Sequence, residues 1–170
     1  LGETRFSSLK MGGIIGNPFD GSLENCLAEW TISEDCWVKS QSSIGGIAGS
    51  AKTVTNCVFD GSLAVGSSPQ IALGGIYGND SAGTYNCFAR GSLSGGGTIG
   101  GVAGKATGTI ENSSAACKIV AGQGVVSGAI AGNNAGAVKE CRWVGDLGAS
   151  QPVGGGAGTI VSTDAVASES

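Results

Sequence analysis

Hydrophobic and polar positions alternate in five similar segments, each following a residue that is Cys in four copies and Ser in one. Two, four and six residues after that position the residues are apolar or Gly, and those three and five residues after it are mostly polar or charged. A pattern with a period of two predicts a β-strand with one buried face. The residues six positions on, which we expect to stack as a core ladder, are Ile32, Leu63, Leu93, Ile119 and Leu147.

Two further ladders are predicted where each of these strands begins. We interpret the Cys position as a stack of small buried thiols that pack like hydrophobic side chains; disulfides between neighbouring copies are a second interpretation. The preceding residue is Asn in four copies, and Asn tolerates the left-handed backbone, so it predicts a corner with stacked amides. These ladders are Cys26, Cys57, Cys87 and Cys141, and Asn25, Asn56, Asn86 and Asn112.

A glycine-rich phrase recurs six times, at residues 11–16, 44–49, 73–78, 99–104, 127–132 and 153–158. Its closing glycines lie 33, 29, 26, 28 and 26 residues apart, a mean near 28. We expect the phrase to form a second short strand, whose glycines allow corners and close approach of stacked backbones. Its inward-pointing residues would be Ile14, Ile47, Ile76, Val102 and Ile130.

A repeat of this length cannot bury its own apolar face, so its copies must stack around a continuous core. The sequence predicts an all-β fold, a right-handed β-solenoid (β-helix) of about five to six coils with one repeat of about 28 residues per coil. The solenoid would span residues 1–160, with repeats beginning near 11, 44, 73, 99, 127 and 153, and residues 161–170 would be a polar tail or cap. A β-propeller is the main rival, but its blades need about 40 residues.

Composition excludes several kinds of chemistry. The 170 residues include 33 Gly, 6 Cys and no His, and the net charge is −4. Without His the chain can form neither a Ser-His-Asp triad nor a Cys/His zinc site, and we expect no metal, no cofactor and no enzymatic activity. The basic residues are scattered, which disfavours nucleic-acid binding, and the apolar runs are too short to span a membrane. We expect the chain to be a mature or excised fragment of a longer protein.

Aromatic side chains are the candidate ligand-binding residues, because rings can stack on sugars. Trp37 lies in the longest connection between strands, residues 33–43, Phe88 occupies an outward position, and Tyr77 lies beside a closing glycine. A second interpretation has Trp37 covering the end of the column as a cap. The acidic residues of the first copy are interpreted as a solvated face: Asp20, Glu24, Glu29, Glu34 and Asp35.

The two recurring phrases resemble the GLUG-motif repeat family. The segment 85–93 is the most similar copy and 56–63 is next, and the resemblance covers about residues 9–158. Such repeats occur in large secreted or surface proteins of bacteria, including adhesin-like proteins and some IgA-cleaving metallopeptidases, where they lie outside the catalytic domain. The resemblance therefore implies an extracellular or cell-surface location.

The resulting prediction is a non-catalytic structural or adhesive repeat region of a larger secreted or cell-surface protein. A stiff column would present variable loops to a host or matrix glycan or protein. The alternatives are a carbohydrate-binding module that uses exposed aromatic rings, and an inert spacer for another domain. Self-association through the open ends of the solenoid is a further expectation.

Overall fold

A computed structural model of the chain describes residues 9–16, 19–33, 41–66, 68, 70–79, 82–95, 97–122, 125–145, 147–149 and 159–160. Within these residues every regular element is a β-strand, and every strand pairing is parallel. Gly12 and Gly128 occupy the same place in the first and fifth strands of one sheet, so four turns take 116 residues, or 29 per turn. The predicted β-solenoid and its repeat length are confirmed, although about four turns are described rather than five to six.

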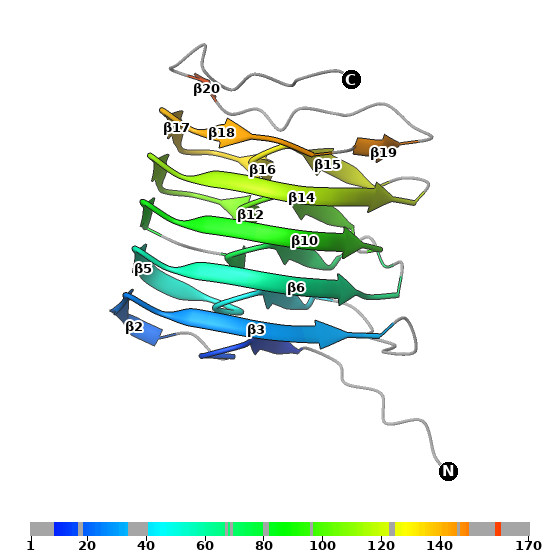
Figure 1. Ribbon diagram of the computed structural model, residues 1–170, viewed down its shortest axis with the longest axis horizontal. Coiled ribbons are helices and arrows are strands. Elements are labelled where there is room, and N and C mark those ends of the chain that lie inside the picture. Colours follow the sequence, from blue (N-terminus) through cyan, green and yellow to red (C-terminus); the bar gives the residue numbers. More distant parts are fainter. Residues whose placement is uncertain are drawn as a thin grey trace.

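The turns contribute short strands to four sheets, which we call sheets I to IV in chain order (Figure 1); in sheet II the first two turns form only isolated bridges, at Ile15 and Ala48. Sheet I contains β1 (Lys10–Gly12), β4 (Ser43–Gly45), β7 (Ala72–Gly74), β11 (Thr98–Gly100) and β15 (Val126–Gly128). Sheet II contains β8 (Tyr77–Asn79), β12 (Ala103–Ala106) and β16 (Ala131–Asn134). Sheet III contains β2 (Phe19–Glu24), β5 (Ala51–Thr55), β9 (Gly83–Tyr85), β13 (Thr109–Glu111), β17 (Ala137–Lys139) and β20 (Thr159–Ile160).

Sheet IV holds the longest strands and faces the viewer in Figure 1, where β3, β6, β10 and β14 lie one above another. Its strands are β3 (Leu27–Ile32), β6 (Val58–Ala64), β10 (Phe88–Ser94), β14 (Ser114–Ala121), β18 (Arg142–Trp143) and β19 (Leu147–Ala149). Leu93 pairs with Leu63 on one side and with Ile119 on the other. The predicted core ladder is therefore in register, and its members Ile32, Leu63, Leu93 and Ile119 are buried.

The Asn positions form the corner between sheets III and IV. The φ angles of Asn25, Asn56, Asn86 and Asn112 lie between 49° and 55°, and Glu140 has 48° at the equivalent place. The Asn56 side chain donates a hydrogen bond from Nδ2 to Oδ1 of Asn25 at 3.3 Å, which is one rung of the expected amide ladder. The left-handed corner predicted from the sequence is thus present in every described turn.

The glycine-rich phrase does not form the single strand that we expected. It ends a strand of sheet I, bends at its second glycine and the following residue, and then enters sheet II. Ile47, Ile76, Val102 and Ile130 are buried at this bend, as predicted, but Ile14 is 45% exposed. Ile14 lies in the first turn, where among the described residues another turn covers it on one side only.

The bend points into the molecule and reaches the inner face of sheet IV. A Cβ atom added to Gly46 would collide with the Phe59 ring and with the carbonyl oxygen of Gly75. One added to Gly45 would collide with the backbone of Ala48 and Tyr77, because strands of sheets I and II approach with only backbone between them. Glycine is required here for lack of space, whatever its conformational freedom.

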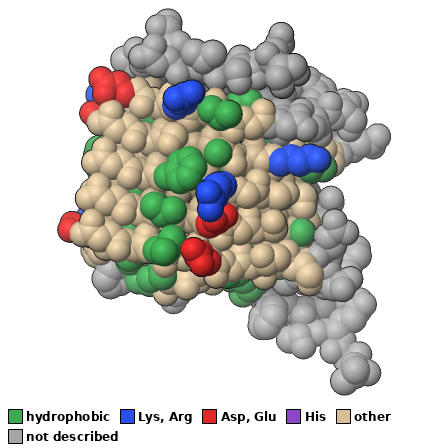
Figure 2. Space-filling view, in the orientation of Figure 1, with side chains coloured by type: hydrophobic (Ala, Val, Ile, Leu, Met, Phe, Trp, Pro, Cys, Tyr) green, Lys and Arg blue, Asp and Glu red, His purple; other side chains and the backbone are tan. Residues whose placement is uncertain are grey.

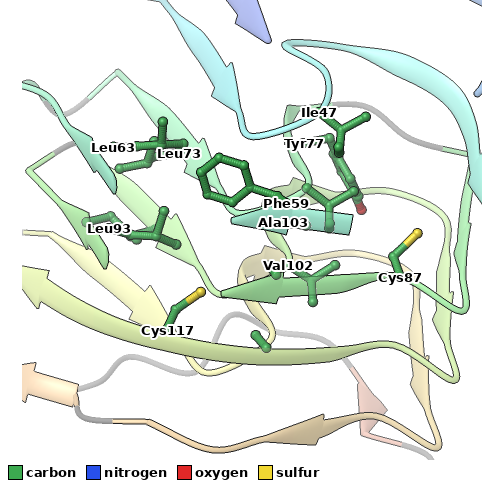
Figure 3. Close-up of a cluster of buried hydrophobic side chains, with 14 of the residues drawn as sticks. Ile47, Phe59, Leu63, Leu73, Tyr77, Cys87, Leu93, Val102, Ala103 and Cys117 are labelled. Atoms are coloured by element: carbon green, nitrogen blue, oxygen red, sulfur yellow. The ribbon is translucent and has the colours of Figure 1, made fainter. Parts of the chain in front are cut away.

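The core fills the space between this glycine bend and sheets III and IV. Figure 3 shows Ile47 from the glycine bend, Phe59 from sheet IV and Tyr77 from sheet II pointing toward a common interior, with Leu63 and Leu93 stacked beside them. These five side chains are at most 1% exposed. One continuous core therefore runs along the described turns, as the stacking argument requires.

The predicted end of the domain is only partly described. The last glycine-rich phrase, residues 153–158, and the predicted tail, residues 161–170, lie outside the described residues. Before the tail, β20 pairs with β17, and Leu147 pairs with Ile119 in the expected core register. Among the described residues, no helix is long and apolar enough to cross a membrane.

Candidate binding surfaces

An apolar strip lies on the outer face of sheet IV. Leu27, Val58 and Phe88 begin β3, β6 and β10, and they stand opposite one another in the strand register. Leu27 is 60% exposed, and the other two are half-buried. Figure 2 shows hydrophobic side chains gathered on this face beside a small charged cluster. Three apolar side chains that point away from the core form a surface that a partner could cover.

The charged cluster occupies the next outward column, formed by Glu29, Asp60 and Arg90. The Arg90 guanidinium donates hydrogen bonds to Asp60 Oδ2, at 3.1 Å from Nε and more closely from Nη2. These hydrogen bonds lower the pKa of Asp60 and raise that of Arg90. Because both groups are exposed to water, the pair orients the two side chains more than it stabilises the fold.

The Cys ladder lies inside the corner between sheets III and IV. Cys57, Cys87 and Cys141 are buried and each donates its thiol to the carbonyl oxygen two residues earlier, at 3.1 to 3.3 Å. Cys26, in the first turn, is half-buried and makes the same contact with the Glu24 carbonyl at 3.4 Å. All four are free thiols, which matches the interpretation as a buried stack and not the alternative of disulfides.

Burial makes Cys87, Cys117 and Cys141 poor nucleophiles by raising their pKa, and it shields Cys57 from solvent. It raises the pKa of Cys117, in the middle of β14, to about 12, and it also raises that of Cys141. A hydrogen bond to Cys57, together with burial, raises the pKa of Cys87, and the same hydrogen bond lowers the pKa of Cys57. Reactive cysteines are partly exposed thiolates in electropositive surroundings, and the buried Cys57, Cys87, Cys117 and Cys141 do not match that description.

The structure separates the three aromatic residues proposed to bind ligands. Phe88 points outward, as predicted, and belongs to the apolar strip. Tyr77 is 1% exposed, so the expectation of a ring that faces a ligand is wrong there. It pairs with Ala48 and Ala103 in an inward column of sheet II, where its larger ring fills the core. Trp37 lies outside the described residues.

The acidic residues of the first turn are solvated as expected. Asp20, Glu24 and Glu29 are exposed, and Asp20 forms an ion pair with Lys52 at 3.6 Å. Glu34 and Asp35 lie outside the described residues. In the part of the chain that the structure describes, no three His, Cys, Asp or Glu side chains are grouped to hold a metal ion.

Leu27 and Val58 are the surface residues that sequence reasoning missed. The signal was available, because the position directly after the Cys column is apolar in three successive copies. Those residues lie in an outward column, so their apolar character serves no purpose in the core.

Comparison with protein-family models, with curated proteins and with solved structures finds no match to this chain.

Proposed function

We propose that this chain is a non-catalytic structural and adhesive repeat region of a larger secreted or cell-surface protein. The observation that carries the proposal is the apolar strip of Leu27, Val58 and Phe88, aligned on the outer face of a stiff sheet. Exposed apolar side chains cost solubility unless a partner covers them, and here they line up along the column axis. The adjacent Arg90 and Asp60 would add polar specificity at the rim of such an interface.

The extracellular location is part of the same proposal. It rests on the resemblance of the glycine-rich and Asn-Cys phrases to the GLUG-motif repeat family, whose members include secreted and surface proteins of bacteria. The fold is compatible with that role, because a stack of similar turns offers an extended surface that varies at its connections.

Adhesion is tested by binding of the 170-residue chain to an array of glycans and matrix proteins. We expect saturable binding that Phe88→Ser weakens about tenfold, since the variant removes the aromatic ring of the strip. The matched control is Val126→Ser, which replaces another exposed apolar residue, on sheet I. Equal binding by both variants and the parent chain would move the adhesive surface away from sheet IV.

Two other outcomes of the array experiment would support the alternative hypotheses, a carbohydrate-binding module and an inert spacer. Binding to sugars that is lost in Trp37→Ala and kept in Phe88→Ser would support a carbohydrate-binding module centred on the 33–43 connection. No binding to any surface at high micromolar concentration would refute adhesion and leave an inert spacer.

A further inference from the structure

A polar groove lies where sheets I and II meet the connections from sheet IV, away from the apolar strip. It encloses about 470 Å³. Pockets of 300–1,000 Å³ hold small molecules, so the groove is large enough for two or three sugar units. Its lining residues are Lys10, Gln41, Ser42, Ser43, Gln70, Ala72, Asn79 and Lys105.

The lining is chemically one-sided. Among the described residues it provides two lysine ammonium groups and three side-chain amides, and no carboxylate; its two serines are buried, and the Ser42 hydroxyl already accepts from the Leu9 amide. Lys10 and Lys105 are half-buried, and neither forms an ion pair with another described residue. Two lysines without an acidic partner among the described residues thus line this groove, in a chain whose net charge is −4. Such a lining favours an anion that also carries many hydroxyl groups.

The register of the strands places the lysines at opposite ends of the groove. Lys10 pairs with Ser43, which pairs with Ala72, so Lys10 and Ala72 lie two strands apart. Lys105 follows Gly104, whose backbone packs against that of Ala72 and Leu73. With about 4.8 Å between strands, the Cα atoms of the two lysines are roughly 10 Å apart along the column axis. The neutral amides of Gln41, Gln70 and Asn79 lie between the two lysines.

We propose that this groove binds an acidic oligosaccharide, with one carboxylate or sulfate at each lysine and sugar hydroxyls on the amides between. Nucleic acid fits less well, since it needs a longer row of cations and rings on which bases stack, and none of the described residues that line the groove is aromatic. The inference deepens the proposed adhesive function by naming a ligand class and rests on that function, but its site is separate from the strip on sheet IV.

The test is calorimetric titration of the 170-residue chain with a tetrasaccharide that carries a uronic acid at alternate units. The comparison ligand is the same tetrasaccharide with its carboxyl groups reduced to alcohols. We expect the acidic form to bind at least about tenfold more tightly, and added salt to weaken it. Equal affinity for the two forms would overturn the proposal, as would displacement of the sugar by an equimolar concentration of inorganic sulfate or a tetraglutamate peptide.

Variants locate the site. Lys105→Gln and Lys10→Gln should each reduce affinity for the acidic tetrasaccharide about tenfold. Lys118→Gln is the matched control, because it removes the same charge from the outer face of sheet IV. Unchanged affinity in both groove variants would overturn the assignment, provided that thermal unfolding shows all three to be folded. Array binding that depends on Phe88 without any binding of the tetrasaccharide would refute the groove and keep the proposed adhesive function.

Discussion

Each turn changes direction at the glycine bend between sheets I and II and at the Asn corner between sheets III and IV, and different physical effects determine the two. At the corner between sheets I and II, glycine leaves no side chain between backbones that nearly touch, as at Gly45 and Gly46. At the corner between sheets III and IV, polar side chains carry the structure, with Asn in a left-handed conformation followed by a thiol that donates to a carbonyl. At the first corner the available space restricts which residue fits. At the second corner the backbone conformation and the hydrogen bonds restrict it, so the two corners should respond differently to substitution.

The largest effect is expected from Gly75→Val, at the corner between sheets I and II. The added side chain would collide with the Gly101 carbonyl and the Ala89 methyl group, so the stacked turns must separate. We expect a loss of about 3 kcal/mol in the free energy of unfolding, measured with urea. Ser92→Val introduces the same side chain on the outer face of sheet IV and should change stability by less than about 0.5 kcal/mol. Similar losses in the two variants would show that the glycine corner has room to adapt.

A smaller effect is expected from Asn86→Ala, at the other corner. Asn86 has φ of 54°, and a non-glycine residue without a local polar partner pays about 1–2 kcal/mol for that conformation. Asn86→Gly adopts the same backbone freely and should stay within about 0.5 kcal/mol of the parent chain. If Asn86→Gly lost as much as Asn86→Ala, stacking of the amides and not the backbone conformation would account for the role of Asn.

Cys87→Ser should cost about 1 kcal/mol or less in urea unfolding, because acceptors for a polar group are already present. Ser113 occupies the equivalent place one turn on, where its hydroxyl donates to the Glu111 carbonyl at 3.0 Å and accepts from the Cys87 amide at 3.1 Å. Cys87→Leu, which overfills the same place, should cost more. A serine variant as unstable as Gly75→Val would mean that this corner does not accept even a side chain of similar size.

The smallest effect is expected outside both corners, at the Arg90–Asp60 ion pair. Its hydrogen bonds lower the Asp60 pKa from 3.8, so its contribution to stability is present above pH 3.8 and is lost as pH falls further. The drop in melting temperature between pH 5 and pH 2.5 should be slightly smaller in Asp60→Asn than in the parent chain. If the melting temperature of the parent chain falls no further than that of the variant, the ion pair contributes nothing to stability.

Register and burial in sheet IV could be predicted from the sequence because each strand repeats one alternating pattern. The position of Leu63 between Ile32 and Leu93 follows from alignment of the copies alone. The left-handed corner was also predictable, since Asn is among the few residues that adopt that conformation at low cost.

The predictions were wrong where the surroundings of a residue, and not its type, determine whether its side chain is buried. Ile14 matches the buried Ile47 in sequence, yet it lies at an end of the described stack, which an average repeat does not represent. Tyr77 was expected to face a ligand because it is aromatic and lies beside a closing glycine, but it pairs with Ala48 and Ala103 in an inward column. The groove was not predicted, because Lys10 and Lys105 lie 95 residues apart and meet only through the stacking of turns.

The winding of the chain determines how long a column a given number of residues can form. Each turn consumes 29 residues and advances the column by one strand spacing, roughly 0.17 Å per residue. An α-helix advances about 1.5 Å per residue, roughly nine times as far for the same length of polypeptide. A protein that needed only distance from a cell would gain little from this architecture. What the solenoid produces in abundance is lateral surface, because nearly all the residues of each turn run around the column and not along it.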